Sequence, residues 1–280
     1  MGSIIIPQIE HDLIAVGEVL LDVTVAELVR GRVSHAPVSV RAGGVPVNAA
    51  LAAVAHGATA AVVGRVGSDP AAAAVRAELG AAGVEAILAV DDELPTGTFV
   101  ETGEGDERAI SAYRGASARL SPGDIPALDA RAVLVSGHAL LRDDTAPAAR
   151  AALEAAGAPL VAVVAAGPIG ADFHARAKGA NVLFANEDEA RTLTGLELRE
   201  AALALAELYE VAVVTAGAAG AVAVSGVEIA AGRPSETVRS RRSGAGDAFA
   251  GVFLVALAGG ASLAEALDGA CEAGRRALVS

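Results

Sequence analysis

The chain has 280 residues, 53% of them apolar, so it can bury a substantial core and fits one large domain. A formal net charge of -13 and an aromatic content of 2% argue against a nucleic-acid partner. The single cysteine, Cys271, excludes an internal disulfide and a cysteine metal site and suits a reducing cytosol. No basic region precedes the short apolar patch at the start and no apolar run is long enough to cross a bilayer, so we expect a soluble, cytoplasmic protein without a membrane partner.

The first predicted element is a buried strand over the apolar residues 13–19, closely followed by Asp22. Open α/β sheets bind ligands beyond the carboxyl ends of their strands, so Asp22 is a candidate ligand-binding residue. The alternative is a solvated acid in a loop.

Two later segments, 33–41 and 95–114, alternate polar and apolar residues and predict half-exposed strands. The second contains a Gly-Glu-Gly-Asp turn and ends in Tyr113 and Arg114. An arginine fork suits a carboxylate or several hydroxyl groups, but an exposed position fits these two residues equally well.

Between these segments lies a glycine-rich stretch, residues 42–69, which begins A-G-G-V-P-V-N. Gly43 and Gly44 permit a close backbone approach, and Asn48 offers a donor and an acceptor together. A helix over 49–56 and a strand over 60–63 are predicted to follow. The two glycines serve either a ligand or close packing.

The next part of the chain alternates strands with helices, which predicts βαβ units and a parallel sheet covered by helices on both faces. The expected strands are 132–135, 160–164, 181–185 and 211–215, with a helix over 146–155. Asn186 and Glu189 follow one strand, in a cluster typical of a helix cap with an acidic first turn. Thr215 and Gly217 begin a glycine-containing turn after another.

A second glycine-rich stretch, residues 242–260, reads R-S-G-A-G-D-A-F-A-G-V-F-L-V-A-L-A-G-G and predicts a tight turn that opens a helix. The first N–H groups of such a helix lack intrahelical partners and lie at the positive end of its dipole, so they can bind a phosphate or an oxyanion. Asp247 in this turn either caps the helix or serves as a base.

In order and wording, the two glycine-rich stretches resemble the two signatures of the ribokinase-like (PfkB) carbohydrate kinases, and the resemblance extends from Gly17 to about Cys271. It implies an α/β fold, a ribokinase-like three-layer α/β/α sandwich with a mostly parallel central sheet and a small β-sheet lid. Residues 1–280 would form a single kinase domain, with lid strands inserted at about 23–42 and 94–115. Such lids are often shared across a dimer, so the resemblance also implies a homodimer.

The resemblance assigns roles to the candidate residues. It implies that Asp247 is the general base and that the backbone of Gly244, Ala245 and Gly246 forms the anion hole. The residues implied to bind the substrate are Asp22, Gly43, Gly44, Asn48, Tyr113 and Arg114. Those implied at the ATP site are Thr215, Gly217, Asn186 and Glu189. Asn186 and Glu189 would also hold Mg²⁺ through water, which suits an ion that favours oxygen ligands and keeps several waters.

The sequence departs from the family pattern on the nucleotide side. Arg241 stands where many members carry an acid that helps to bind a monovalent cation, so we expect no activation by potassium. Ala165 and Ala166 follow a strand that usually ends near an Asp or Asn, and the chain stops at Ser280, where relatives continue. These departures permit weakened or altered nucleotide use.

The function implied is transfer of the γ-phosphate of ATP to a sugar hydroxyl, that is, a phosphotransferase with an alcohol acceptor. The amino-acid sequence around Gly17-Glu18, Gly43–Asn48 and Tyr113-Arg114 is most similar to that of fructokinase and 2-keto-3-deoxygluconate kinase. This resemblance favours a keto-sugar or a sugar acid as the acceptor. The alternatives are a ribokinase or nucleoside kinase, or a catalytically weak sugar-binding or regulatory homologue. A dinucleotide oxidoreductase is disfavoured because no G-x-G-x-x-G follows the first strand.

Overall fold

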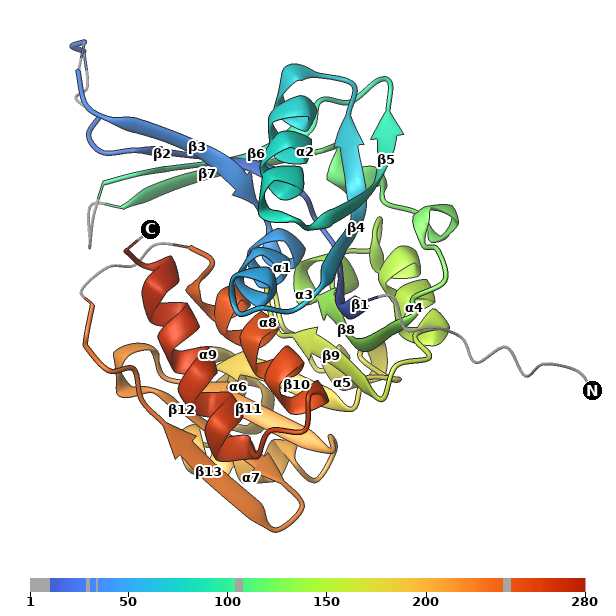
Figure 1. The fold of residues 1–280 in the computed structure, drawn as a ribbon, viewed down its shortest axis with the longest axis vertical. Coiled ribbons are helices and arrows are strands. Elements are labelled where there is room, and N and C mark those ends of the chain that lie inside the picture. The colour runs from blue at the N-terminus through green and yellow to red at the C-terminus, as the bar shows by residue number, and fades with distance from the viewer. Residues whose placement is uncertain (1–10, 29–30, 34, 104–107, 239–242, 280) are drawn as a thin grey trace, which may run out of the picture.

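The computed structural model describes residues 11–28, 31–33, 35–103, 108–238 and 243–279, which form a large sheet, a small sheet and helices on both faces of the large one (Figure 1). The strands of the large sheet are β1 His11–Val16, β4 Ala60–Gly67, β5 Glu85–Asp91, β8 Ala130–Ser136, β9 Leu160–Val164, β10 Val182–Asn186, β11 Val211–Thr215, β12 Ala221–Ser225 and β13 Glu228–Gly232. The small sheet consists of β2 Leu20–Val25, β3 Val38–Gly43, β6 Thr96–Thr102 and β7 Ala109–Gly115. The helices are α1 Val45–Ala55, α2 Pro70–Ala82, α3 Gly137–Leu140, α4 Ala146–Ala155, α5 Phe173–Arg176, α6 Glu187–Thr194, α7 Leu198–Leu205, α8 Ala245–Ala258 and α9 Leu263–Ala277.

The large sheet has the strand order β13-β12-β11-β10-β9-β8-β1-β4-β5. Its strands are parallel from β5 across to β11, and β12 and β13 complete one edge in antiparallel pairing. The strand β1 lies inside the sheet, where Leu13 is in register with Ala60 of β4 and Ala132 of β8. Both neighbours come from later in the chain, so β1 completes its pairing only after β8 has been added.

Successive side chains of β1 enter two separate cores, because neighbouring residues of a strand point to opposite faces. Leu13 and Ala15 join the cluster that contains Phe253 of α8, whereas Ile14 and Val16 join the cluster that contains Phe173 of α5. The first cluster also draws side chains from α1, α2 and α9, and the second from α4, α6 and α7. Both faces of the sheet are therefore covered, as the apolar strands predict. None of the helices in the described ranges is long and apolar enough to cross a bilayer.

The predicted element boundaries hold for some elements and shift for others. The helix expected at 146–155 has those bounds. The helix α1 begins at Val45, earlier than expected, because Gly44 takes the N-cap position with φ 100° and Pro46 fits the first turn. The strand expected from residue 33 begins only at Val38, following Pro37, which has no N–H to donate.

The small sheet corrects the position expected for Asp22. The apolar run at 13–19 predicted one strand, but β1 ends at Val16 and the chain crosses to the small sheet, where Asp22 lies within β2. The crossing passes Ser136 so closely that a Cβ on Gly17 would lie 2.6 Å from the Cβ of that serine. Only glycine fits there, so the break follows from a tertiary contact that the local pattern does not contain.

The small sheet has the order β3-β2-β6-β7, with β2 parallel to β6 and the other pairs antiparallel. Strand alternation gives it two different faces. The register places Asp22 opposite Phe99 and Phe99 opposite Ala112 on the inner face, which lines a cavity. The outer face carries the valines Val23, Val25, Val38, Val40 and Val100.

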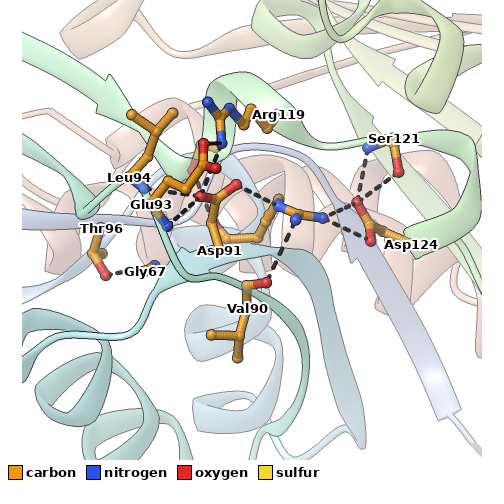
Figure 2. A network of polar contacts seen from close by, with 11 residues as sticks. Gly67, Val90, Asp91, Glu93, Leu94, Thr96, Arg119, Ser121 and Asp124 are labelled. Carbon is orange, nitrogen blue, oxygen red and sulfur yellow. Dashed lines mark hydrogen bonds and ion pairs between the residues drawn. The ribbon is translucent and has the colours of Figure 1, made fainter.

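A polar network joins the large sheet to the segments at the base of the small sheet (Figure 2). Asp91, at the end of β5, accepts hydrogen bonds from the N–H groups of Glu93 and Leu94 and pairs with Arg65 and Arg119. The N–H of Leu94, then that of Glu93 and the Arg65 guanidinium, hold the pKa of Asp91 down to about 2. Arg65 continues the network by pairing with Asp124 at 3.0 Å. The base of the small sheet is thereby fixed by charge-assisted bonds.

Candidate active site

The inner face of the small sheet and the carboxyl ends of several large-sheet strands enclose a cavity of about 420 Å³, here called the acceptor cavity. Its lining includes His138 after β8, Ala165 after β9, Asn186 at the end of β10 and Thr215 at the end of β11. This is the edge at which parallel α/β sheets bind ligands, and the volume is within the range of about 300–1,000 Å³ of small-molecule sites.

Asp247 brings the two glycine-rich stretches together. It lies in the first turn of α8, and its Oδ2 accepts a hydrogen bond of 3.0 Å from Nδ2 of Asn48 on α1. Gly244, the N-cap residue with φ 95°, passes so near that an added Cβ would lie 2.7 Å from the same Nδ2. Burial raises the pKa of Asp247 to about 6; the Asn48 hydrogen bond lowers it and the charge of Glu18 raises it further. Asp247 is thus a base that remains ionised at neutral pH.

The start of α8 also presents backbone donors. The N–H of Ala248 makes the first intrahelical bond, to the Gly244 carbonyl, so the N–H groups of residues 245–247 have no intrahelical acceptor. A Cβ added to Gly246 would meet nothing within 4 Å. An unfilled space beside free N–H groups at the positive end of a helix fits an anion such as a phosphate.

Asp22 is the second carboxylate of the acceptor cavity, with only 6% of its surface exposed. Burial raises its pKa to about 6; Arg41 opposes that change, and the charge of Asp247 adds to it. Of the two glycines predicted to bind the substrate, Gly44 lines the cavity and Gly43 does not; a Cβ on Gly43 would lie 2.2 Å from the Asp22 carboxylate. Gly43 therefore makes room for Asp22 and lies outside the cavity lining.

Asn186 and Glu189 form a reciprocal capping box at the start of α6. Oε2 of Glu189 accepts from the Asn186 N–H at 2.8 Å, and Oδ1 of Asn186 accepts from the Glu189 N–H at 2.9 Å. Burial and the charge of Asp247 raise the pKa of Glu189 to about 7, although the Asn186 N–H opposes the rise. A nearby cation would lower this pKa, and both side chains offer oxygen, so the pair fits a hydrated Mg²⁺ ion. Among the described residues, no group of three or more His, Cys, Asp or Glu is arranged to hold a metal directly.

A second cavity, the nucleotide cavity, has a volume of about 1,110 Å³ and meets the acceptor cavity at Thr215 and Gly246, which line both. Gly217 and Ala245, both predicted site residues, line the nucleotide cavity. Its other walls come from α8, α9 and the small sheet, and include Phe249 and Cys271. The two cavities therefore meet at the first turn of α8, beside Asp247. Arg241, on which the cation expectation depends, lies outside the described residues.

The small sheet is bonded directly to Ser243, the residue before the α8 turn. Arg41 donates to the Ser243 carbonyl at 3.1 Å, and Arg108 donates to the Ser243 Oγ at 2.7 Å. Arg108 is held in turn by a bidentate pair with the buried Glu101. The position of the small sheet and the position of the candidate anion hole are linked through these contacts.

Tyr113 and Arg114 separate on opposite faces of β7, which corrects their prediction as a pair. Arg114 lines the acceptor cavity, where it pairs with Asp144 at 2.7 Å. Tyr113 does not line the cavity and is 51% exposed. It is in register with Thr98, on the face opposite to Phe99, so the strand alternation turns it away from the cavity.

Three ionisable residues of the lining were not predicted as site residues: Glu18, His138 and Arg142. His138 follows β8, so the rule that selected Asn186 and Thr215 could have found it. Glu18 lies in the crossing between the sheets and Arg142 in a turn after α3, and only the tertiary structure places them in the cavity.

Comparison with known proteins identifies relatives of this chain. The Caulobacter vibrioides protein named "Bifunctional protein HldE" is 33% identical over 284 residues, which cover 91% of this chain but only 57% of that protein. The chain thus spans little more than half the length of this relative.

Solved structures share the fold. Adenosine kinase from Sinorhizobium meliloti superposes with a TM-score of 0.85 at 23% identity, covering 96% of this chain and 94% of that one. A putative ribokinase II from E. coli in complex with ATP and Mg²⁺ gives 0.82 at 19%, covering 96% and 93%. Ribokinase from Arabidopsis thaliana, complexed with ribose and ATP, gives 0.76 at 23%, again covering 96% and 93%. The predicted ribokinase-like α/β fold is confirmed.

The family pattern described as "pfkB family carbohydrate kinase" matches residues 10–278, nearly the whole chain. Kinases of this type are phosphotransferases that act on hydroxyl groups of sugars or nucleosides, the enzyme class that the two signatures implied. The chain belongs to the pfkB family of carbohydrate kinases.

Proposed function

We propose that this protein transfers the γ-phosphate of ATP to a hydroxyl group of a keto-sugar or sugar acid, with Asp247 as the general base. The observation that carries the proposal is the position of Asp247, which lines the acceptor cavity next to Gly246, where the two cavities meet, and lies in the first turn of α8, whose N–H groups have no intrahelical acceptor. In this arrangement an acceptor held in one cavity and a nucleotide held in the other meet at a carboxylate of raised pKa.

The reaction follows from these groups. The acceptor hydroxyl loses its proton to a carboxylate oxygen of Asp247 while its oxygen forms a bond to the γ-phosphorus. The bond from that phosphorus to the bridging oxygen breaks, and ADP leaves with the electron pair. The N–H groups of residues 245–247 stabilise the charge on the transferring group, since positioning and electrostatics carry most of this chemistry. When bound near Asn186 and Glu189, Mg²⁺ would neutralise phosphate charge.

The remaining predicted residues have roles that fit their positions. Asp22, Asn48, Gly44 and Arg114 line the acceptor cavity and would bind acceptor hydroxyls, with Asn48 also holding Asp247 in place. Thr215 and Gly217 line the nucleotide cavity and would contact ATP.

The test is ADP formation from Mg-ATP with fructose, 2-keto-3-deoxygluconate, ribose, other pentoses and hexoses, and nucleosides. We expect the largest kcat/KM for fructose or 2-keto-3-deoxygluconate. A preference for ribose or a nucleoside would overturn the acceptor class and leave the kinase. Absence of turnover with every acceptor, alongside thermal stabilisation by a sugar, would overturn the kinase activity itself. Potassium should not accelerate turnover, which is checked by replacing it with a bulky organic cation.

We further propose a single kinase domain in which the small sheet closes the acceptor cavity as a lid and pairs with a second copy through its outer face. Val40 on that face is 54% exposed, beside the half-buried Val23 and Val100, whereas Val38, 59% exposed, also lines the nucleotide cavity. Exposed apolar patches of this kind mark interaction surfaces. Val40→Glu should shift the molar mass measured by light scattering from dimer to monomer, whereas Val227→Glu, at an exposed turn, should not. A monomeric parent protein would contradict the pairing. A cytoplasmic location, which the lone Cys271 suits, belongs to the same proposal.

A further inference from the structure

Glu18 has one unsatisfied carboxylate oxygen in the lining of the acceptor cavity. It lines this cavity, and its Oε2 is buried without a hydrogen-bond partner. Buried polar groups are satisfied in the great majority of cases, so an unpartnered carboxylate facing a ligand cavity needs an explanation.

Hydrogen bonds hold the backbone on both sides of Glu18. A poorly fixed backbone therefore does not explain why its Oε2 has no partner. Gly17 donates to the Val63 carbonyl at 3.1 Å, and Val19 exchanges hydrogen bonds with the Ser117 Oγ at 3.1 and 2.9 Å. The Glu18 carbonyl packs against Gly44, where an added Cβ would lie 2.1 Å from its oxygen. The backbone that carries this carboxylate is therefore held in place in the free protein.

The surroundings of Glu18 indicate what it accepts. Its charge acts on Asp247, so the two carboxylates lie in one part of the cavity, together with Asp22. An ionised carboxylate only accepts hydrogen bonds, and a bound anion would be repelled there. A neutral hydroxyl group is a suitable partner, because an O–H donated to a carboxylate makes a strong charge-assisted bond.

We propose that Glu18 is an acceptor-binding residue that receives a hydrogen bond from a second hydroxyl group of the sugar, distinct from the one that is phosphorylated. The proposal rests on the proposed function and narrows it: the acceptor carries at least two hydroxyl groups, one for Asp247 and one for Glu18. The carboxylates of Glu18, Asp22 and Asp247 would repel an anionic group of the acceptor, whereas Arg114 and Arg142 in the same lining would attract one.

The test compares Glu18→Ala and Glu18→Gln with the parent protein, using the best acceptor of the panel above and its monodeoxy analogues. A lost hydrogen bond to a charged group corresponds to roughly 10- to 100-fold in affinity, so KM for the acceptor should rise by about that factor in Glu18→Ala. KM for ATP should stay unchanged. The parent should discriminate against one deoxy analogue that Glu18→Ala no longer distinguishes from the full sugar.

Thermal unfolding separates this role from a structural one. The buried Oε2 of Glu18 makes no hydrogen bond that the substitution could remove, so Glu18→Ala should unfold at the same or a higher temperature without ligand, although it binds the acceptor less well. A lowered unfolding temperature with an unchanged KM would overturn the proposal. So would a shifted pH profile with an unchanged KM, because Glu18 would then act only on the pKa of Asp247.

Sugar binding and phosphate transfer can be measured separately. Fructose, 2-keto-3-deoxygluconate and ribose are titrated without ATP by calorimetry, so binding is measured whether or not turnover occurs. Equal binding of the sugars by the parent and Glu18→Ala would overturn the role of Glu18 alone. Weaker binding by the variant, with no turnover in either protein, would support Glu18 and contradict the kinase.

Discussion

The two cavities that meet at the start of α8 are built from different parts of the chain. The acceptor cavity is lined by charged, amide and apolar side chains, and two of its glycines are tightly packed: a Cβ on Gly44 would lie 2.1 Å from a carbonyl oxygen, and one on Gly244 would lie 2.7 Å from Nδ2 of Asn48. At the nucleotide side, Gly217 and Gly246 have nothing within 4 Å of an added Cβ. Packing is not confined to the acceptor side, because a Cβ on Gly220, which also lines the nucleotide cavity, would lie 2.0 Å from the Gly232 carbonyl oxygen. The open space at Gly246 is shared, since this residue lines both cavities.

The acceptor cavity also gathers carboxylic acids whose pKa is raised. Asp22, Glu189 and Asp247 all line the acceptor cavity, and burial raises the pKa of each. An acid whose pKa is raised on folding favours the folded state less as the pH rises through that pKa. The acceptor cavity therefore lowers stability near neutral pH, and ligand hydroxyls or a cation would offset this.

The largest effect is expected at the junction itself. Asp247→Asn removes the base without changing its size, so kcat should fall by roughly 10²- to 10⁴-fold, the usual contribution of a general base. Acceptor binding, measured as thermal stabilisation, should persist. Asp268→Asn, at an exposed position of α9, is the matched control and should keep full activity. Near-normal turnover of Asp247→Asn would show that another group takes the proton.

Substitutions at two glycines test whether the two cavities bind different substrates. Gly43→Ala should force the Asp22 carboxylate from its place, lowering the unfolding temperature and raising KM for the acceptor. Gly246→Ala, in the first turn of α8, should leave stability unchanged or higher by roughly 0.5–1 kcal/mol, because alanine favours the helix. Its KM for ATP should rise, since the methyl group enters the shared space. If both variants changed the same constant, the proposed division of roles between the cavities would be wrong.

A smaller effect is expected in the pH profile. The Asn48 hydrogen bond lowers the pKa of Asp247, so Asn48→Leu should raise that pKa and move the acidic limb of kcat/KM to higher pH. In the parent this limb should lie near pH 6, with activity lost as the pH falls and the base is protonated. Because three carboxylates interact here, the limb reports the group together. An unshifted limb would indicate that Asp247 does not set it.

The smallest effect on catalysis is expected at the base of the small sheet, outside both cavities. The pKa of Asp91 is about 2 in the folded protein, below its usual value, so its ionised form stabilises the fold above about pH 4 and this is lost as the pH falls toward 2. Asp91→Asn should therefore unfold at a lower temperature at pH 7, with the gap narrowing in acid. At permissive temperature its kcat/KM should match the parent. A constant gap across pH would contradict the charge-based role.

Local patterns predicted most of the fold. Apolar runs predicted the strands β1, β4, β8, β9, β10 and β11 of the large sheet, but not β12 and β13 at its edge, and the glycine-rich stretches predicted the turns at Gly44 and Gly244. The crossing at Gly17–Val19 could not be predicted, because contacts with Ser136 and Ser117, far along the chain, create it. Because the crossing was not predicted, Asp22 was expected to follow the first strand, whereas it lies within β2. For the same reason Glu18 was not recognised as a residue of the cavity lining. The face taken by Tyr113 depends on strand register, which an isolated strand does not reveal.

The central place of β1 has a consequence for biosynthesis. This strand is made early, yet its partners β4 and β8 come later, and β8 follows both hairpins of the small sheet in sequence. During translation its apolar edge, Leu13–Val16, stays unpaired until the ribosome has produced roughly half of the chain. Exposed strand edges favour aggregation, so the yield of folded protein should depend on how long nascent chains wait at this stage. Slower synthesis before β8 would prolong that exposure, and a chaperone that shields the strand would shorten it.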